Sequence, residues 1–104
     1  MLVDETFNGR TVEVMLGQTI EVLLNENPTT GFRWQLTSDG SPACAIIDDQ
    51  FKPLVRPPGG GGQHLWRFSV LRPAEGDIEL RYVRHWEVAK EATRTFRIHI
   101  QVKS

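Results

Sequence analysis

The sequence RTFRIHIQVK, residues 94–103, alternates apolar and polar side chains over nearly its whole length. Because successive side chains of a β-strand point to opposite faces, this alternation predicts a strand with one buried and one solvated face. The buried face would carry Phe96, Ile98, Ile100 and Val102. The same period of two recurs, clearly or more weakly, in residues 11–15, 19–25, 32–37, 46–54, 64–72 and 77–83.

Turn signals separate these segments, for example at residues 16–18, 27–28 and 39–42, which combine Gly, Pro, Asn and Ser. About seven or eight short strands, each with one apolar face, predict an all-β protein folded as an antiparallel β-sandwich. A parallel α/β fold would need crossover helices, and the chain has no room for them. A length of 104 residues predicts a single domain, residues 1–104.

The charge balance excludes several classes of partner. Twelve basic and 13 acidic residues give a formal net charge of −1. Binding to nucleic acid or to an anionic membrane needs a basic face, so neither partner is expected. No stretch reaches the ~18 apolar residues of a membrane span. The small net charge favours a monomer.

Cysteine and histidine give no sign of a cofactor. The single cysteine, Cys44, excludes an internal disulfide and is expected to be a small buried apolar residue. The three histidines do not have metal-binding spacing with Cys44, so neither a metal nor another cofactor is predicted. Residues 1–10 lack the apolar run of a signal peptide. This fits a cytoplasmic protein or an exported one whose signal has been removed, and the compartment stays open.

The first of three unusual segments is Asn27-Pro28-Thr29-Thr30-Gly31-Phe32-Arg33-Trp34. Proline restricts its own φ and the residue before it, and Gly31 permits a positive φ at the bend. The two β-branched threonines stiffen the tip. The pattern predicts a loop whose shape is set before binding, although an ordinary turn between strands is an alternative. Phe32 and Trp34 are expected to anchor it in the sandwich.

The second segment is Arg56-Pro57-Pro58-Gly59-Gly60-Gly61-Gly62-Gln63-His64. Four consecutive glycines expose backbone donors and acceptors that can pair with another extended chain. A phosphate-binding loop would need a helix to follow, whereas His64 begins a strand pattern. The alternative is a flexible connection.

The third segment is Tyr82-Val83-Arg84-His85-Trp86-Glu87, in which a strand ends at a tryptophan. A large aromatic side chain at the rim of a loop is a useful interface anchor. The alternative is a tryptophan that folds back onto the core.

In this order and spacing, the three segments resemble the three loop motifs of the chagasin family of cysteine protease inhibitors. Asn27 to Phe32 with Trp34 match the first motif in full, and Gly59 to Gly62, with His64, fit the glycine-rich second motif. The third motif is Arg-Pro-Trp in the family, so His85 departs from it. The resemblance implies an immunoglobulin-like sandwich and a function as a reversible, tight-binding inhibitor of papain-like, cathepsin L-like cysteine proteases.

The resemblance also implies how each loop acts. The first loop, with Thr29 and Thr30, would enter the middle of the protease cleft, and the glycine-rich loop would pair along its non-primed side. Trp86 would contact the primed side, with Arg84 supporting that loop. The predicted protease-binding residues are Asn27, Pro28, Thr29, Thr30, Gly31, Phe32, Gly59, Gly60, Gly61, Gly62, His64, Arg84, His85 and Trp86.

Two other functions compete with inhibition. An immunoglobulin-like binding module could present the same loops to a carbohydrate or to a protein that is not a protease. An enzyme would need Cys44 with a histidine, or a carboxylate pair such as Asp48 and Asp49. Neighbouring residues of a strand point to opposite faces, so these aspartates do not form a natural pair, and an enzyme is not predicted.

Overall fold

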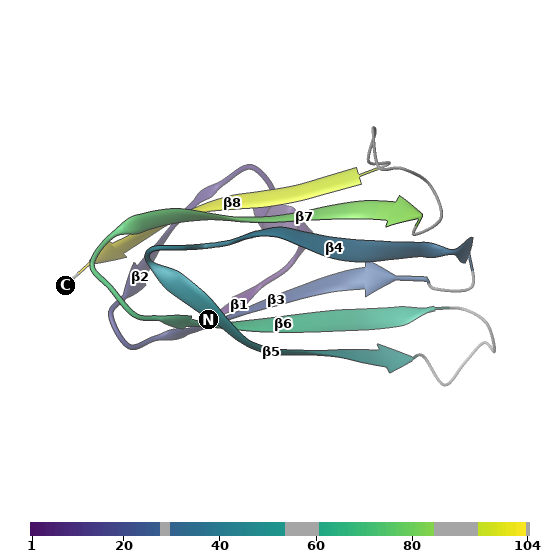
Figure 1. Cartoon of the computed structure of the whole chain (residues 1–104), viewed down its shortest axis with the longest axis horizontal. Coiled ribbons are helices and arrows are strands. Elements are labelled where there is room, and N and C mark those ends of the chain that lie inside the picture. Colours follow the sequence, from purple (N-terminus) through teal and green to yellow (C-terminus); the bar gives the residue numbers. More distant parts are fainter. Residues whose placement is uncertain (28–29, 54–60, 85–93, 104) are drawn as a thin grey trace.

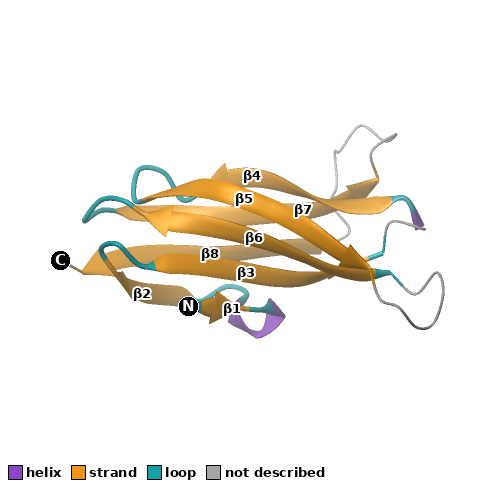
Figure 2. Ribbon diagram, turned by 90° about the horizontal axis from the view of Figure 1, so that it is seen from below, coloured by secondary structure: helices purple, strands orange, loops and turns teal. Residues whose placement is uncertain are grey.

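The computed structural model describes residues 1–27, 30–53, 61–84 and 94–103, and within them eight strands form two facing sheets (Figures 1 and 2). The all-β sandwich predicted from the sequence is confirmed. The elements are β1 (Leu2–Val3), the 3-10 turn η1 (Glu5–Phe7), β2 (Thr11–Met15), β3 (Thr19–Glu26), β4 (Phe32–Asp39), β5 (Cys44–Pro53), β6 (Gly62–Val70), β7 (Glu75–Arg84) and β8 (Arg94–Lys103).

The strand order is β1-β3-β6-β5 in one sheet and β2-β8-β7-β4 in the other. The chain changes sheet after β1, β2, β3, β4 and β6, whereas β5–β6 and β7–β8 are antiparallel neighbours within one sheet. Two pairs are parallel, β1 with β3 and β2 with β8. A period of two gives the faces of a strand but not the direction of its partner, so the sequence pattern could not reveal these parallel pairs.

The core lies between the sheets and is built from the inward positions of each strand. In β8, Phe96, Ile98 and Ile100 are at most 2% exposed, as the alternation predicts. Trp66 and Phe68 are buried in β6, and Cys44 is buried at the start of β5, as expected. Burial of these apolar side chains is the main term that holds the two sheets together.

The N-terminal segment was not predicted from the sequence. Two residues, Leu2 and Val3, pair with Glu21 and Val22 of β3, and a strand this short has no readable period. The Asp4 carboxylate accepts hydrogen bonds from the backbone N–H and the hydroxyl of Thr6, which starts the turn η1.

The strands connected by the three unusual segments all meet at one end of the sandwich, which we call the loop end. The last residues of β3, β5 and β7 and the first residues of β4, β6 and β8 lie there (Figure 1). They are Glu26, Pro53, Arg84, Phe32, Gly62 and Arg94. Over the described ranges, the model contains no helix that is long and apolar enough to cross a membrane.

Candidate functional site

The register of the strands places the bases of the three loops side by side. Gly62 pairs with Glu26 on one side and with Pro53 on the other, and Phe32 pairs with Arg84 in the second sheet. Of the predicted site residues, the described ones gather at this end: Asn27, Thr30, Gly31, Phe32, Gly61, Gly62, His64 and Arg84. The others, Pro28, Thr29, Gly59, Gly60, His85 and Trp86, lie outside the described residues.

The base of the first loop is closed by its own hydrogen bonds. The backbone carbonyl of Asn27 accepts from the backbone N–H of Thr30 at 3.2 Å and from its hydroxyl at 2.7 Å. The same hydroxyl oxygen accepts from the N–H of Phe32 at 3.4 Å. Gly31 has a φ of 84°, a conformation that glycine adopts without steric cost. The loop base is therefore shaped by local contacts.

Aromatic side chains join the first loop to the second sheet. The backbone N–H of Asn27 donates to the Tyr82 hydroxyl at 3.1 Å. The Phe32 ring stacks on the Tyr82 ring, and Trp34 lies against the same ring, with centroid distances of 5.2 and 4.8 Å. The Trp34 indole N–H also donates to the carbonyl of Asn25 at 2.8 Å. These contacts give Phe32 and Trp34 the anchoring positions that the sequence predicted.

The base of the second loop needs glycine for steric reasons. Gly61 has a φ of 80°, and a Cβ there would lie 2.8 Å from the carbonyl oxygen of Glu26. A Cβ on Gly62 would lie 2.2 Å from the carbonyl oxygen of Lys52. Both distances are shorter than any real Cβ contact. These two glycines therefore let the loop base pass closely between strands β3 and β5, in addition to exposing backbone.

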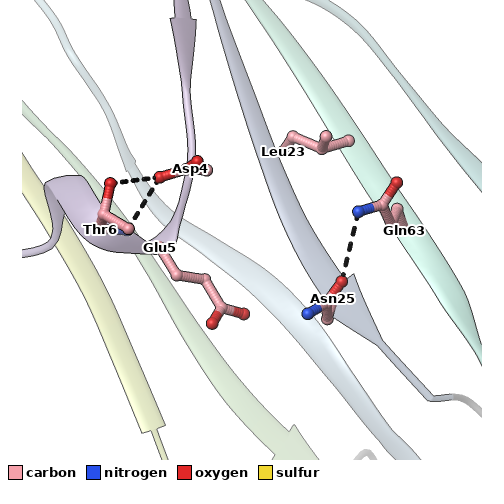
Figure 3. A pocket seen from close by; sticks show the side chains of 6 residues that line it. All are labelled: Asp4, Glu5, Thr6, Leu23, Asn25 and Gln63. Atoms are coloured by element: carbon pink, nitrogen blue, oxygen red, sulfur yellow. Dashed lines mark hydrogen bonds between the residues drawn. The ribbon is translucent and has the colours of Figure 1, made fainter.

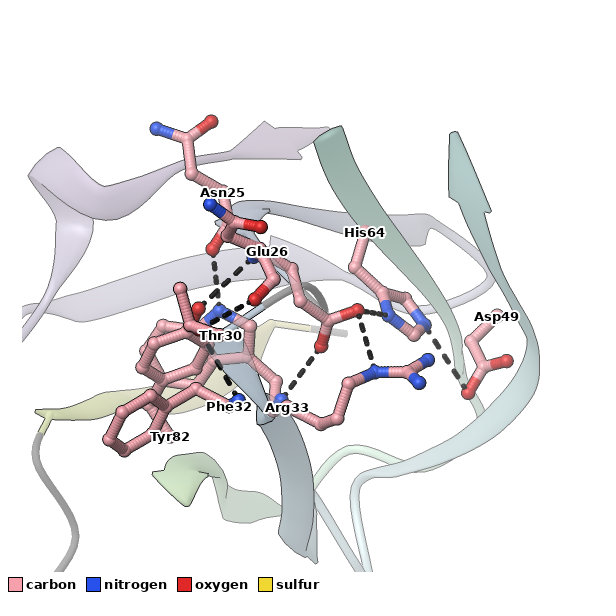
Figure 4. Close-up of polar contacts among 10 residues, drawn as sticks. Asn25, Glu26, Thr30, Phe32, Arg33, Asp49, His64 and Tyr82 are labelled. Carbon is pink, nitrogen blue, oxygen red and sulfur yellow. Dashed lines mark hydrogen bonds and ion pairs between the residues drawn. The ribbon is translucent and has the colours of Figure 1, made fainter. Parts of the chain in front are cut away.

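A buried polar cluster lies beneath the first two loops (Figure 4). The Glu26 side chain is fully buried, and its Oε2 accepts from the backbone N–H of Trp34 at 2.7 Å. Its Oε1 lies 3.0 Å from Nδ1 of His64 and 3.4 Å from Nε of Arg33. One carboxylate thus contacts groups from both sheets.

The side chain of His64 faces inward. It is 11% exposed and stacks on Trp66, with the ring centroids 4.0 Å apart and the planes 4° from parallel. Its Nε2 lies 3.7 Å from a carboxylate oxygen of Asp49. The resemblance implies that His64 contacts a protease, and in the structure only 11% of its side chain is exposed at the loop end.

The sequence reasoning did not identify Glu26 as a site residue, although a signal was present. Inward positions of β3 are Ile20, Val22, Leu24 and then Glu26, so the alternation itself assigns an acidic residue to the apolar face. A carboxylate at such a position requires hydrogen-bond partners, because burying an unpaired charge is very costly.

The base of the third loop is attached to the first. The Arg84 guanidinium lies over the Phe32 ring, 4.6 Å from its centroid. At the other side of the loop, Arg94 lies 5.8 Å from the centroid of the Trp34 ring and forms a 3.2 Å ion pair with Glu5. Cation–π contacts of this kind add stability beyond the area they bury. A side chain from each strand that flanks the third loop therefore contacts an aromatic ring of β4, the strand that follows the first loop.

A shallow hollow of about 280 Å³ lies on the outer face of the first sheet, between η1 and strands β3 and β6 (Figure 3). It is lined by Asp4, Glu5, Thr6, Leu23, Asn25 and Gln63. Across the described residues, no group of three or more His, Cys, Asp or Glu side chains could hold a metal ion.

Comparisons with known proteins find relatives that match nearly the whole chain. Residues 13–100 match the family model described as chagasin family peptidase inhibitor I42. The chain is 32% identical to amoebiasin-1 of Entamoeba histolytica, over 97% of this chain and 100% of that protein. It is 26% identical to chagasin of Trypanosoma cruzi, over 95% and 94% of the two chains.

A crystal structure shows the same fold. It is that of the cysteine protease inhibitor EhICP2 from Entamoeba histolytica, which superposes with a TM-score of 0.85 and is 23% identical. The match covers 98% of this chain and 94% of that one. With a family model that spans most of its length, the chain belongs to the chagasin family, whose members are peptidase inhibitors and not enzymes.

Proposed function

We propose that this protein is a reversible, tight-binding inhibitor of papain-like cysteine proteases that fills the active-site cleft with the three loops of the loop end. Family membership and the name of the similar crystal structure, a cysteine protease inhibitor, support this protease class. The observation that carries the proposal is the mutual attachment of the three loop bases, through Glu26 and His64 and through the rings of Phe32 and Tyr82.

Attached loop bases matter because ordering loops on binding subtracts from affinity. Each rotamer-rich side chain that becomes immobile costs about 0.5–1.5 kcal/mol, and loop ordering adds to this. A loop end that is shaped before binding avoids much of that cost. In the proposed complex, Thr29 and Thr30 enter the centre of the cleft, the glycines from Gly59 to Gly62 pair with the protease backbone, and Trp86 contacts the primed side.

Inhibition of this kind needs no covalent step. The single thiol, Cys44, is buried, and burial raises its pKa to about 11, so it is a poor nucleophile at neutral pH. Cleavage of the inhibitor would be slow unless a loop peptide reached the attack geometry, which tolerates errors of only about 1 Å. The loop end inhibits by occupying the active-site cleft.

Titration of papain and of a cathepsin L-like protease with the purified protein tests the proposal, with trypsin as the control. We expect papain activity to fall nearly linearly to zero at one equivalent of inhibitor. The activity should recover after prolonged incubation of the diluted complex. Trypsin should keep its activity. Full activity of all papain-like proteases at micromolar inhibitor would contradict the proposal and favour a binding module for another ligand.

A further inference from the structure

We propose that Glu26 and His64 form a positioning pair, which holds the first and second loops at a fixed spacing for protease binding. The inference rests on the proposed function, because spacing matters only if both loops enter one cleft. Neither side chain would touch the protease: Glu26 is fully buried and the His64 side chain is 11% exposed. They would act through the loops that begin next to them.

The first argument is that the pair is exceptional in its surroundings. Among the described residues, Glu26 and His64 are the only buried side chains that are polar or charged, and they contact each other. Buried ion pairs are weak sources of stability, since apolar residues of similar volume are often as good or better. A polar pair buried at such a position points to a requirement other than stability, and this one lies at the base of two loops.

The second argument is the number of strands that the pair connects (Figure 4). Glu26 is the last residue of β3, directly before Asn27, and its carboxylate accepts from the N–H of Trp34 in β4. Through Nδ1, His64 attaches the same carboxylate to β6, two residues after Gly62. A hydrogen bond loses most of its strength when its atoms move apart by an ångström. The two loop bases are therefore held in one relative position.

The third argument is that the His64 ring has little freedom to move. It is stacked on Trp66 at 4.0 Å, and the Phe51 ring meets it edge-on at 6.2 Å. Asp49 of β5 lies 3.7 Å from its other nitrogen. The charged groups that face the pair are thus Arg33 at Glu26 and Asp49 at His64. A ring held in this way keeps Nδ1, the nitrogen that faces the Glu26 carboxylate, at one point.

Two substitutions separate positioning from simple packing. His64→Phe keeps a flat ring that can stack on Trp66 but removes the donor to Glu26. His64→Gln loses the ring but keeps an N–H that can reach the Glu26 carboxylate. If His64 serves only to fill space, the Phe variant should inhibit better than the Gln variant. If His64 positions the loops through its donor, the Gln variant should inhibit better.

The experiment measures the inhibition constant Ki against papain at a temperature where circular dichroism shows each variant fully folded. We expect His64→Phe to raise Ki at least about tenfold, and His64→Gln to raise it less than about threefold. The control is Glu21→Gln, which removes the 3.2 Å ion pair between Glu21 and Arg67 of the same two strands, away from the loop end. Its Ki should equal that of the wild type.

The results distinguish two kinds of failure. If the wild-type protein does not inhibit papain, the proposed function fails. If the wild type inhibits and folded His64→Phe inhibits within twofold of it, or better than His64→Gln, the positioning pair is refuted. Should His64→Phe not fold, His64→Leu, which also lacks a donor, replaces it in the comparison with the same expected order.

Discussion

The hydroxyl of Tyr82 accepts a hydrogen bond from the backbone N–H of Asn27 at 3.1 Å, which connects the two sheets across the loop end. Asn27 directly follows β3 of one sheet, whereas Tyr82 lies in β7 of the other, two residues before Arg84. A single side chain thereby couples the start of the first loop to the strand that leads into the third.

Tyr82→Phe is expected to destabilise the fold and to weaken inhibition. The substitution removes the oxygen that accepts from Asn27 but keeps the ring stacked on Phe32. Loss of one partner of a partly buried hydrogen bond costs about 1–3 kcal/mol. Urea denaturation measures the loss of stability, and Ki against papain should rise several-fold. Arg81→Gln, in the same strand but exposed, is the control, and an equal effect from it would contradict the role of the hydroxyl.

Gly62→Ala is expected to disturb inhibition more than its cost in stability explains. The new Cβ would meet the carbonyl oxygen of Lys52 at 2.2 Å, so the base of the second loop has to shift. Overpacking of this kind costs about 1–3 kcal/mol. Gly76→Ala is a matched control, because its Cβ would meet the carbonyl oxygen of Gly40 at 2.1 Å, away from the loop end.

Both glycine variants should unfold at lower urea concentration than the wild type. Only Gly62→Ala should raise Ki against papain when both proteins are fully folded. Equal Ki values for the two variants would show that the backbone at Gly62 does not set the position of the second loop.

Trp86→Ala is expected to weaken protease binding by at least about 2 kcal/mol, which is the threshold of an interface hot spot. The reason is the proposed contact of a large aromatic ring with the primed side of the cleft. The measurement is Ki against papain and a cathepsin L-like protease, with Trp86→Phe as a milder variant. A loss below about 0.5 kcal/mol would remove Trp86 from the proposed binding residues.

His99 is expected to make stability depend on pH. Its ring donates to the carboxylates of Glu75 and Asp77, at 2.8 and 2.7 Å, and these hydrogen bonds raise the pKa of His99 above its ordinary 6.5. The same bonds hold the pKa of Glu75 and of Asp77 below their ordinary values of 4.5 and 3.8.

Whether stability rises or falls with pH depends on whether the folded or the unfolded protein binds the proton of each group more tightly. The contribution of His99 to the free energy of unfolding is fully present below pH 6.5, and it is lost as the pH rises through the raised pKa of His99. The carboxylate contributions are present above about pH 4.5 and are lost as the pH falls. The melting temperature of the wild type should therefore exceed that of His99→Gln most between pH 4.5 and 6.5, and the difference should shrink by pH 9. A difference independent of pH would contradict this.

Cys44 is expected to be unreactive in the folded protein. The thiol is buried and its pKa is raised to about 11, chiefly by desolvation, so the reactive thiolate is scarce at pH 8. The reagent DTNB should react with one thiol per chain in guanidinium chloride and with almost none in its absence. Rapid reaction of the native protein would show that the start of β5 opens readily.

The strand pattern was largely predictable because alternation directly encodes burial. For β8, the predicted residues 94–103 equal the observed strand, and in β2 residues 11–15 do as well. The pairing of β1 and the parallel directions of β1–β3 and β2–β8 were not predictable, since they depend on contacts between distant segments. The gathering of the loop bases also depends on which sheet each strand joins.

The buried pair was predictable in part. Glu26 follows Leu24 at an inward position, and His64 precedes Trp66 at another, so parity alone places both side chains inside. The alternation along each strand could not show that the two side chains face each other. That depends on the register between the strands, in which Leu24 pairs with His64 and Glu26 with Gly62. The predicted contact of His64 with a protease rested on the resemblance alone, whereas the burial of its side chain follows from its position two residues before Trp66 in β6.

The two ends of the described chain are far from the surface proposed to meet the protease. Lys103 pairs with Met15 at the opposite end of the sandwich, and the N-terminal amino group donates to the carbonyl of Thr19, the first residue of β3 (Figure 1). An affinity tag, a fluorescent fusion or a covalent tether attached on the C-terminal side of Lys103 would leave the proposed protease-binding surface free. Immobilised through that handle, the protein should serve as a capture reagent that withdraws active papain-like proteases from solution.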